Sequence, residues 1–350
     1  MKTSIFTSFI GLVWLFLLSG CEFFSSTGSS RKIGINAAGI AYEIVVVAKP
    51  DIWNDSVGTV IKNELIMEVP GLPQYEPSMR VMQVSPEDFN GMLTYVRNIL
   101  MVDISESLYT KVSVRTESDR WANGQAVVYL SSPSADSLSA YLLQHRGMMV
   151  KYYTQMEMER LAEYYKKTYS SLIYGKLKEK FDIGLNVPED FASYKDTTDF
   201  FWATNDARVG QTYIAVYTFP YTDKNTFTGD YLIAKRDSMM RRHVPGSFPG
   251  SYMRTTEYVT YTPVTLQGTY CGVLRGLWDT YGDKMGGPFV SYARLDEVHN
   301  RVIVTEGFVY SPDTDKRNYI RRIEAALHTL QLPGKSTVTS SDENQTALQQ

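Results

Sequence analysis

The chain has 350 residues, of which 43% are hydrophobic and 21% are charged, a composition typical of globular proteins and not of disordered ones. Its 35 basic and 38 acidic side chains nearly cancel, which argues against a protein that binds nucleic acid. No stretch beyond residue 20 approaches the length of apolar sequence that a membrane-spanning helix needs.

The first 20 residues have the pattern of a secretory signal peptide. Lys2 provides a positive start, and residues 5–18 form an almost unbroken apolar run that is too short for a stable membrane span. The sequence Leu-Ser-Gly-Cys at 18–21 resembles a bacterial lipobox, in which the chain is cut before the cysteine and the thiol is acylated. The resemblance therefore implies lipidation of Cys21. The alternative is a plain secretory signal followed by an incidental cysteine.

Residues 21–40 follow as a lipidated Cys21 and a flexible tether rich in small residues. The tether lacks the acidic run that marks surface export in some lineages, and Glu22 is not the aspartate that favours retention in the inner membrane. We expect an outer-membrane lipoprotein that faces the periplasm and contacts the membrane through its anchor. Surface exposure is the less favoured alternative, and the choice between inner and outer membrane stays open.

The expected N-terminal half covers residues 41–133. Short β-branched or alternating runs, typical of strands, combine there with stretches of helical periodicity. Helices are expected from Asp55 to Met67 and from Ser85 to Arg97, each with a polar residue suited to the helix start. Strands are expected at 43–48, 79–85, 99–105, 111–116 and 125–131.

Residues 134–182 form a segment in which helical periodicity dominates. Apolar and tyrosine side chains line one face of the expected helix, weakened at Gly147 and Gly175, and Glu157 is the one misfit on that face. We expect the tyrosines of this face to point into a core.

The expected C-terminal half covers residues 183–332, and a disordered tail follows at 333–350. Helices are expected at 228–242 and from about 313 to 330, with β-structure resuming at 181–188. Further strands are expected at 200–204, 212–219, 257–264, 269–274, 289–295 and 302–310. The fold class is therefore α+β, with largely antiparallel sheets and flanking helices in two similar-looking halves joined by the long helical segment.

Standard catalytic and cofactor-binding motifs are missing, so we expect no cofactor and no metal, and an enzyme is the less favoured class. Cys271 lies in an apolar strand pattern and is expected to be a buried packing residue. A nucleophile paired with His243 or His299 is the alternative. Residues 313–315 resemble the start of a calcium loop, but their place before an apolar helix favours capping.

A cluster of basic residues lies at the end of the helix expected at 228–242. Arg236, Arg241 and Arg242 suit the dipole at the C-terminus of that helix. An anion site is the alternative.

The best candidate surface for a ligand or partner lies in residues 276–289. Glycines there permit close backbone approach, while aromatic and sulfur-containing side chains offer an apolar surface with hydrogen-bonding groups. The candidate residues are Trp278, Tyr281, Met285 and Phe289. The favoured interpretation of the segment as a whole is nevertheless a well-packed connection between two strands.

Six short sequence motifs resemble those of an uncharacterised lipoprotein family of the Bacteroidota, catalogued as a domain of unknown function. They are LPQYEP (72–77), RNI (97–99), SYM (251–253), RGLW (275–278), MGGPF (285–289) and EGFVY (306–310). The resemblance spans roughly residues 41–330 and implies an envelope location without supplying catalytic residues. Residues 181–188, followed by aromatic strands and a closing helix, are also faintly similar to the PsbP/Mog1-like fold.

The leading interpretation is a non-catalytic envelope lipoprotein that binds a partner in the envelope or helps to maintain it. A small-ligand carrier built on the aromatic-rich second half is one alternative. The other is a hydrolase that uses carboxylates such as Glu76, Asp279 or Asp283 beside Trp278. The sequence does not identify the ligand, the partner, the reaction or the oligomeric state.

Overall fold

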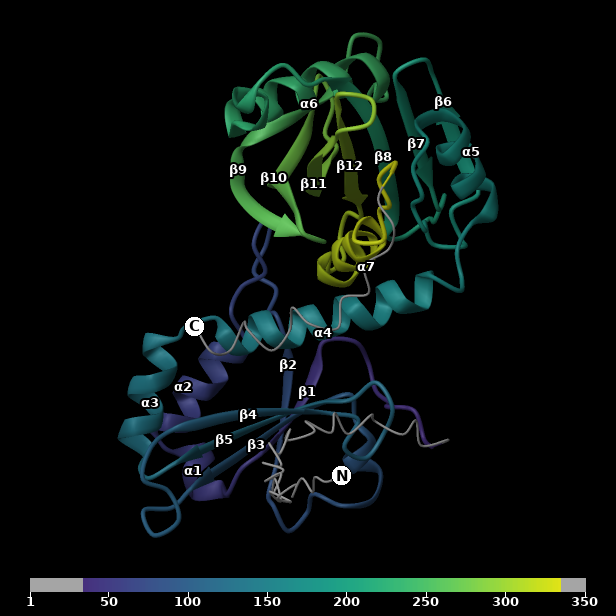
Figure 1. Cartoon of the computed structure of the whole chain (residues 1–350). Coiled ribbons are helices and arrows are strands. Elements are labelled where there is room, and N and C mark those ends of the chain that lie inside the picture. The colour runs from purple at the N-terminus through teal and green to yellow at the C-terminus, as the bar shows by residue number, and fades with distance from the viewer. Residues whose placement is uncertain (1–33, 335–350) are drawn as a thin grey trace, which may run out of the picture. The chain divides into compact units, whose positions relative to one another are not determined.

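The computed structural model describes residues 34–334, which form two β-sheets with helices beside each of them (Figure 1). Of the ten strand pairs, seven are antiparallel and three are parallel. The predicted α+β class with largely antiparallel sheets is therefore confirmed. The expected signal peptide at 1–20, Cys21 and most of the expected tail lie outside the described residues.

The five-stranded sheet has the order β2-β1-β3-β5-β4. Its strands are β1 (Glu43–Val47), β2 (Arg80–Val84), β3 (Asn98–Ile104), β4 (Ser113–Ser118) and β5 (Ala126–Ser132). All three parallel pairs lie here, and only β4 pairs antiparallel. Helices α1 (Pro50–Asn54) and α2 (Ser56–Leu65) form the crossover that a parallel β1–β2 pair requires. The two halves therefore differ in strand pairing, although each combines a sheet with helices.

Both faces of the five-stranded sheet are covered, because successive residues of a strand point to opposite faces. Ile44 and Val46 pack with residues of α2 and of the helices that follow β5. Val45 and Val47 pack on the other face, where the half-buried Trp121 contributes to the cluster. The continuous β-branched run in β1 reflects this burial on both sides.

The helical segment expected at 134–182 consists of α3 (Ala135–Gln144), α4 (Met148–Tyr165) and α5 (Ser171–Phe181). The expected weak point at Gly147 is confirmed, since that glycine has φ +88° and precedes α4. Gly175 does not interrupt α5, and the second break falls before Ser170, which caps α5. No helix in the described part of the chain is both long enough and apolar enough to cross a bilayer.

The seven-stranded sheet is antiparallel throughout, with the order β6-β7-β8-β12-β11-β10-β9. Its strands are β6 (Ser193–Asp196), β7 (Phe200–Thr204), β8 (Gln211–Pro220), β9 (Tyr252–Leu266), β10 (Thr269–Tyr281), β11 (Gly286–Asp296) and β12 (Arg301–Tyr310). Helix α6 (Gly229–His243) packs on one face, and α7 (Arg317–Leu327) packs on the other.

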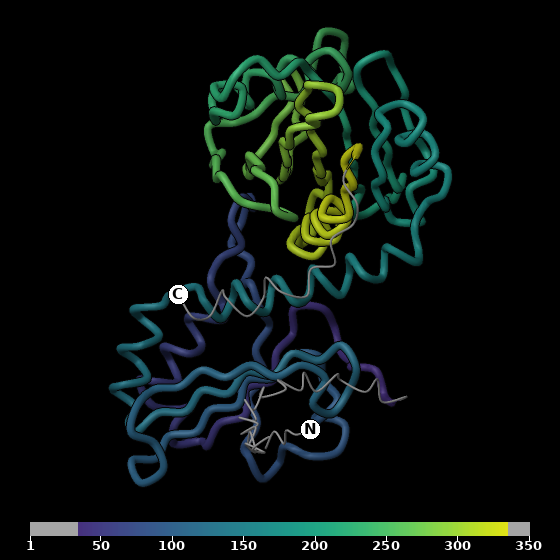
Figure 2. Tube along the Cα trace, viewed as in Figure 1, coloured from purple at the N-terminus to yellow at the C-terminus, as the bar shows by residue number. Residues whose placement is uncertain are grey.

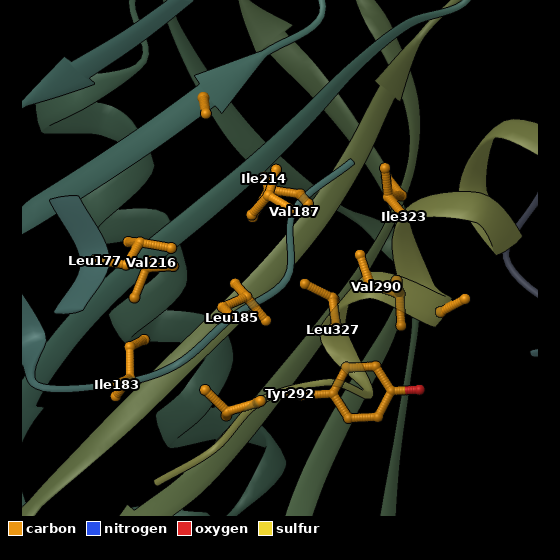
Figure 3. Packing of buried hydrophobic residues seen from close by; sticks show 14 of the residues in the cluster. Leu177, Ile183, Leu185, Val187, Ile214, Val216, Val290, Tyr292, Ile323 and Leu327 are labelled. Carbon is orange, nitrogen blue, oxygen red and sulfur yellow. The ribbon is translucent and has the colours of Figure 1, made fainter. Parts of the chain in front are cut away.

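The core between this sheet and α7 is filled by aliphatic side chains from distant parts of the chain (Figure 3). Residues 183–187 pass through it after α5, and their side chains at Ile183, Leu185 and Val187 are fully buried. This explains the apolar run expected to resume β-structure at 181–188, where the structure has only an isolated bridge between Gly184 and Gln331.

Two further expectations need correction. The helix expected from Ser85 to Arg97 is only a 3₁₀ turn, Gly91–Tyr95, because Asn90 is extended and Gly91 has φ +55°. The tether expected through residue 40 is in part ordered, since Asn36 and Ala38 form bridges to Asn123 and Val96.

Candidate functional site

Residues 67–79, here called the arm, leave α2 and return to β2 as a narrow loop (Figure 2). A β-bridge between Glu68 and Pro77 closes the arm. Val69 and Leu72 are buried in the core beneath the seven-stranded sheet, not in the core of the half from which the arm extends. The arm is therefore a packed structural element that links the two halves.

The carboxylate of Glu76 caps the N-terminus of α7. It accepts hydrogen bonds from the backbone N–H groups of Lys316 at 2.7 Å and Arg317 at 2.8 Å. These groups have no partner within the helix, and the helix dipole favours a negative charge beside them. We expected residues 313–315 to cap this helix, and that expectation is wrong. The helix begins beyond them, and its N-cap residue Lys316 makes no side-chain cap.

Two guanidinium groups of α7 bind the returning part of the arm. Arg317 donates to the carbonyl oxygen of Pro77 at 2.6 Å, and Arg321 donates to that of Ser78 at 2.8 Å. Burial lowers the pKa of Arg321 to about 10. Arg321 forms no ion pair within residues 34–334, and its guanidinium carbon lies 4.2 Å from the centre of the Tyr42 ring. Carbonyl oxygens and an aromatic face thus take the place of a carboxylate.

Tyr42 is the most strained residue at this junction. Its φ of +66° lies in the left-handed region, which is unfavourable for a bulky side chain. The side chain is 3% exposed, and its hydroxyl has no hydrogen-bond partner among the described residues. Burial raises the pKa of this hydroxyl. Such an outlier is held in place by its surroundings and is a reason to look for function nearby.

A pocket with a volume of about 780 Å³ lies beside Tyr42. Its lining comes from four separate segments: the two residues just before β1, the end of α4 and the residues after it, the loop before β6, and α7. The lining residues are Ala41, Tyr42, Leu161, Tyr164, Tyr165, Thr168, residues 188–190, Asn318 and Arg322. Asn318 and Arg322 share one face of α7 because they are four positions apart.

The polar groups of the pocket are largely paired with one another. Arg322 forms an ion pair with Asp190. Burial raises the pKa of Tyr165, which lies beside that guanidinium. Tyr164 is 55% exposed at the rim. This arrangement offers aromatic surface and oriented hydrogen-bonding groups to a small ligand, and sequence reasoning did not anticipate it.

The structure separates the four residues of the predicted surface. Residues 276–289 form the paired ends of β10 and β11, with Trp278 opposite Gly287. Trp278 and Phe289 are buried in the core beneath α6, whereas Met285 is partly buried and Tyr281 is exposed. Trp278 and Phe289 therefore do not share an exposed surface with Tyr281, because strand alternation directs both to the helix-covered face. The favoured interpretation, a well-packed connection between two strands, describes these two residues.

The three candidate carboxylates also occupy separate environments. Glu76 caps α7, as described above. Asp279 pairs with Arg254, whose Nε lies 2.7 Å from its Oδ1. Asp283 accepts a hydrogen bond from the backbone N–H of Ser247 at 2.8 Å. No two of them form the convergent pair that the hydrolase alternative would use.

Cys271 is fully buried, as the packing interpretation expects, and burial raises its pKa to about 12. A thiol in this state is a poor nucleophile. No cluster of three or more metal-ligating side chains occurs within residues 34–334. Cys21, the predicted lipidation site, lies outside the described residues.

Buried ion pairs are the feature that sequence reasoning missed most clearly. Arg236, expected at a basic helix end, is fully buried and its Nη2 lies 2.7 Å from Oε1 of Glu306. Glu324 accepts from Nη1 of Arg275 at 3.1 Å and from the hydroxyl of Tyr292 at 2.5 Å. Burial acts to raise the pKa of Glu324, but Arg275 outweighs it and lowers that pKa to about 2.

A third buried pair explains the misfit on the apolar face of α4. Oε2 of Glu157 lies 3.3 Å from Nη1 of Arg97, and Oε1 lies 3.0 Å from Nη1 of Arg160. The same Oε1 accepts a hydrogen bond from the side-chain amide of Asn98 at 2.7 Å. A charged residue on an otherwise apolar helical face was the one signal in the sequence that pointed to such pairs.

Three of the solved structures that match this chain show low identity and low TM-scores. A mutant of the protein Mog1 matches with 11% identity and a TM-score of 0.27, covering 43% of this chain and 90% of that one. The lipid transfer and protein localization domain of human StarD13 matches with 11% identity and a TM-score of 0.21, covering 45% and 91%. A crystal structure from Bacteroides thetaiotaomicron matches with 15% identity and a TM-score of 0.20, covering 46% and 51%. Similarities at this level carry no argument about function.

No curated protein matches the sequence. Two family models do, and both are described as domains of unknown function. DUF8532 matches residues 37–166, and DUF4837 matches residues 170–329. The boundary between them falls in the break between α4 and α5. The chain therefore matches two family models of unknown function in consecutive segments, DUF8532 and then DUF4837.

Proposed function

We propose that this protein is a lipid-anchored protein of the cell envelope that faces the periplasm and binds a small ligand without transforming it. The ligand site is the pocket beside Tyr42. The signal sequence that ends just before Cys21 supports the anchor and the location. The pocket and its strained tyrosine support the binding role.

The observation that carries the binding proposal is that the residues lining the pocket come from both matched segments of the chain. Tyr42 and Tyr164 belong to the DUF8532 domain, whereas Asp190 and Arg322 belong to the DUF4837 domain. A ligand in the pocket would therefore contact both domains at once. Glu76 and the arm hold the N-terminus of α7, so they also position the wall that carries Arg322.

The environments of the acidic side chains favour binding over catalysis. A general acid or base needs a proton that it can exchange within reach of a substrate. Glu306 and Glu324 are buried in ion pairs, and Glu76 is occupied by backbone N–H groups. Their roles support the fold, and the pocket itself combines tyrosines with the paired Asp190 and Arg322.

The anchor is tested by Cys21→Ala. The substituted protein should remain an unprocessed precursor and should not incorporate labelled fatty acid, because the acylated atom is gone. Fractionation, migration and labelling identical to those of the unaltered protein would contradict the lipid anchor.

The binding role is tested by thiol protection in the full chain, extracted in detergent. Thr168→Cys places a thiol in the pocket, where the acylated Cys21 and the buried Cys271 should not compete for a maleimide. The low-molecular-mass fraction of the cell's own envelopes should slow labelling at this position. Thr262→Cys, exposed on β9, is the control and should be labelled at an unchanged rate. Equal rates at Thr168→Cys with and without the fraction would count against the pocket.

A further inference from the structure

The charged groups of the pocket nearly cancel. Arg322 is its only cation, and the carboxylate of Asp190 neutralises it within the wall. Glu189 is exposed at the edge, where solvent screens its charge. Neither an anion nor a cation would therefore find an uncompensated, desolvated counter-charge in this pocket.

Two other cations near the pocket, Arg317 and Arg321, already have partners elsewhere. Arg317 and Arg321 turn toward the arm and donate to the carbonyl oxygens of Pro77 and Ser78. Neither of them lines the pocket. Binding of a phosphate or carboxylate would need at least one of these groups to give up its present partner.

The remaining lining supplies one exposed aromatic face, that of Tyr164, and neutral hydrogen-bonding groups. The rings of Tyr164 and Tyr165 lie 5.8 Å apart with planes inclined at 61°. Thr168 and Asn318 each carry both a donor and an acceptor. The ion pair of Arg322 and Asp190 is pre-oriented, with lone pairs and N–H groups left over for a ligand.

We propose that the ligand of this pocket is a neutral saccharide. One of its C–H faces would pack on the exposed ring of Tyr164, with the buried Tyr165 behind that ring, and its hydroxyl groups would exchange hydrogen bonds with Arg322, Asp190 and Asn318. The inference rests on the proposed binding function and adds the chemical class of the ligand. Tyrosine suits this role because it combines an apolar ring with a polar edge.

The test uses the full chain in detergent and three defined neutral trisaccharides: maltotriose, mannotriose and triacetylchitotriose. Saturation-transfer NMR should show contact with the C–H protons of at least one of them, and calorimetry then gives its affinity. Tyr164→Ala should weaken that affinity about tenfold, the equivalent of one aromatic contact. Tyr258→Ala is the matched control, because Tyr258 is 67% exposed on β9 and does not line the pocket.

A second variant separates recognition from folding. Arg322→Lys keeps the charge but loses the planar fork, so it should weaken binding while the melting temperature stays close to that of the unaltered protein. Tetramethylammonium and inorganic phosphate are the comparators and should not bind. The inference fails if no trisaccharide binds, if a comparator binds instead, or if Tyr164→Ala and Arg322→Lys bind as tightly as the unaltered protein. If the envelope fraction still slows maleimide labelling of Thr168→Cys in that case, the ligand is not a neutral saccharide but the proposed binding function stands.

Discussion

Glu76 and Arg317 are 241 positions apart in the chain, yet the carboxylate of Glu76 accepts the backbone N–H of Arg317 at 2.8 Å. A residue of the DUF8532 domain thus caps a helix of the DUF4837 domain. The same helix presents Asn318 and Arg322 to the pocket. The structure of the pocket therefore depends on a contact between the two family domains.

The first prediction concerns this cap. Glu76→Ala should lower the free energy of unfolding by about 2 kcal/mol, because it leaves the buried N–H of Lys316 and the partly buried N–H of Arg317 without an acceptor. Glu76→Gln retains an acceptor oxygen and should lose less. Glu68→Ala is the control in the same arm, since Glu68 is exposed. Denaturant unfolding gives the comparison, and equal midpoints for Glu76→Ala and Glu68→Ala would show that the cap does not stabilise the fold.

A second prediction concerns the buried pair of Arg236 and Glu306 beneath α6. Glu306→Gln should destabilise the protein by about 3–5 kcal/mol, because the guanidinium stays buried without its counter-charge. Arg236→Met combined with Glu306→Gln removes that charge and should recover much of the loss. Chemical denaturation of the single and double variants measures the coupling. Strictly additive losses would mean that the two side chains do not depend on each other.

The third prediction is a dependence of stability on pH. Arg275 lowers the pKa of Glu324 to about 2 in the folded protein, so the folded state binds its proton less readily than the unfolded chain. The stabilisation is therefore complete above about pH 5 and is lost as the pH falls toward 2, by about 3 kcal/mol in all.

Glu324→Gln isolates this contribution. The variant is less stable at neutral pH, and its free energy of unfolding should fall less steeply between about pH 5 and about pH 2. Burial also lowers the pKa of the neighbouring His328, which both proteins retain. Parallel curves for the two proteins across the acidic window would refute the assignment.

The fourth prediction separates two residues that the sequence placed in one surface. Trp278 is 4% exposed and packs in the core, so Trp278→Ala should cost about 3–5 kcal/mol. Tyr281 is 53% exposed and stacks on Tyr252, so Tyr281→Ala should change stability by no more than about 0.5 kcal/mol. Thermal unfolding of the two variants measures the difference in stability. A Trp278→Ala protein as stable as the original would overturn this description of the core.

Much of the secondary structure could be predicted because it depends on local patterns. The aromatic run at 200–204 coincides with β7, and the β-branched run at 43–48 contains β1. The failures also have local causes, such as the left-handed Gly91 that prevents a helix after Ser85. Strand partners could not be predicted, because alternation indicates a strand but not its neighbour. The parallel pairs of β1 and β3 were missed for that reason.

The candidate site was beyond prediction because its residues are ordinary in type and distant in sequence. Nothing around Tyr42 signals a left-handed backbone, and nothing around Arg322 signals a partner at Asp190. Helices are commonly capped by residues next to them in the sequence, so the sequence points to the aspartates at 313–315 as the cap of α7. In the structure the cap is Glu76, which lies in the arm. Only the misfit of Glu157 on an apolar face indicated that buried charges would be paired.

Hydrogen exchange of the full chain in detergent tests the central claim, that one pocket shared by the two family domains binds a ligand. With the low-molecular-mass envelope fraction present, peptides covering Tyr164 to Thr168 and peptides covering Asn318 to Arg322 should both exchange more slowly, because a ligand in the pocket contacts both segments. Peptides from β9 should not change. Protection confined to one segment, or found elsewhere while both segments exchange as before, would contradict the claim.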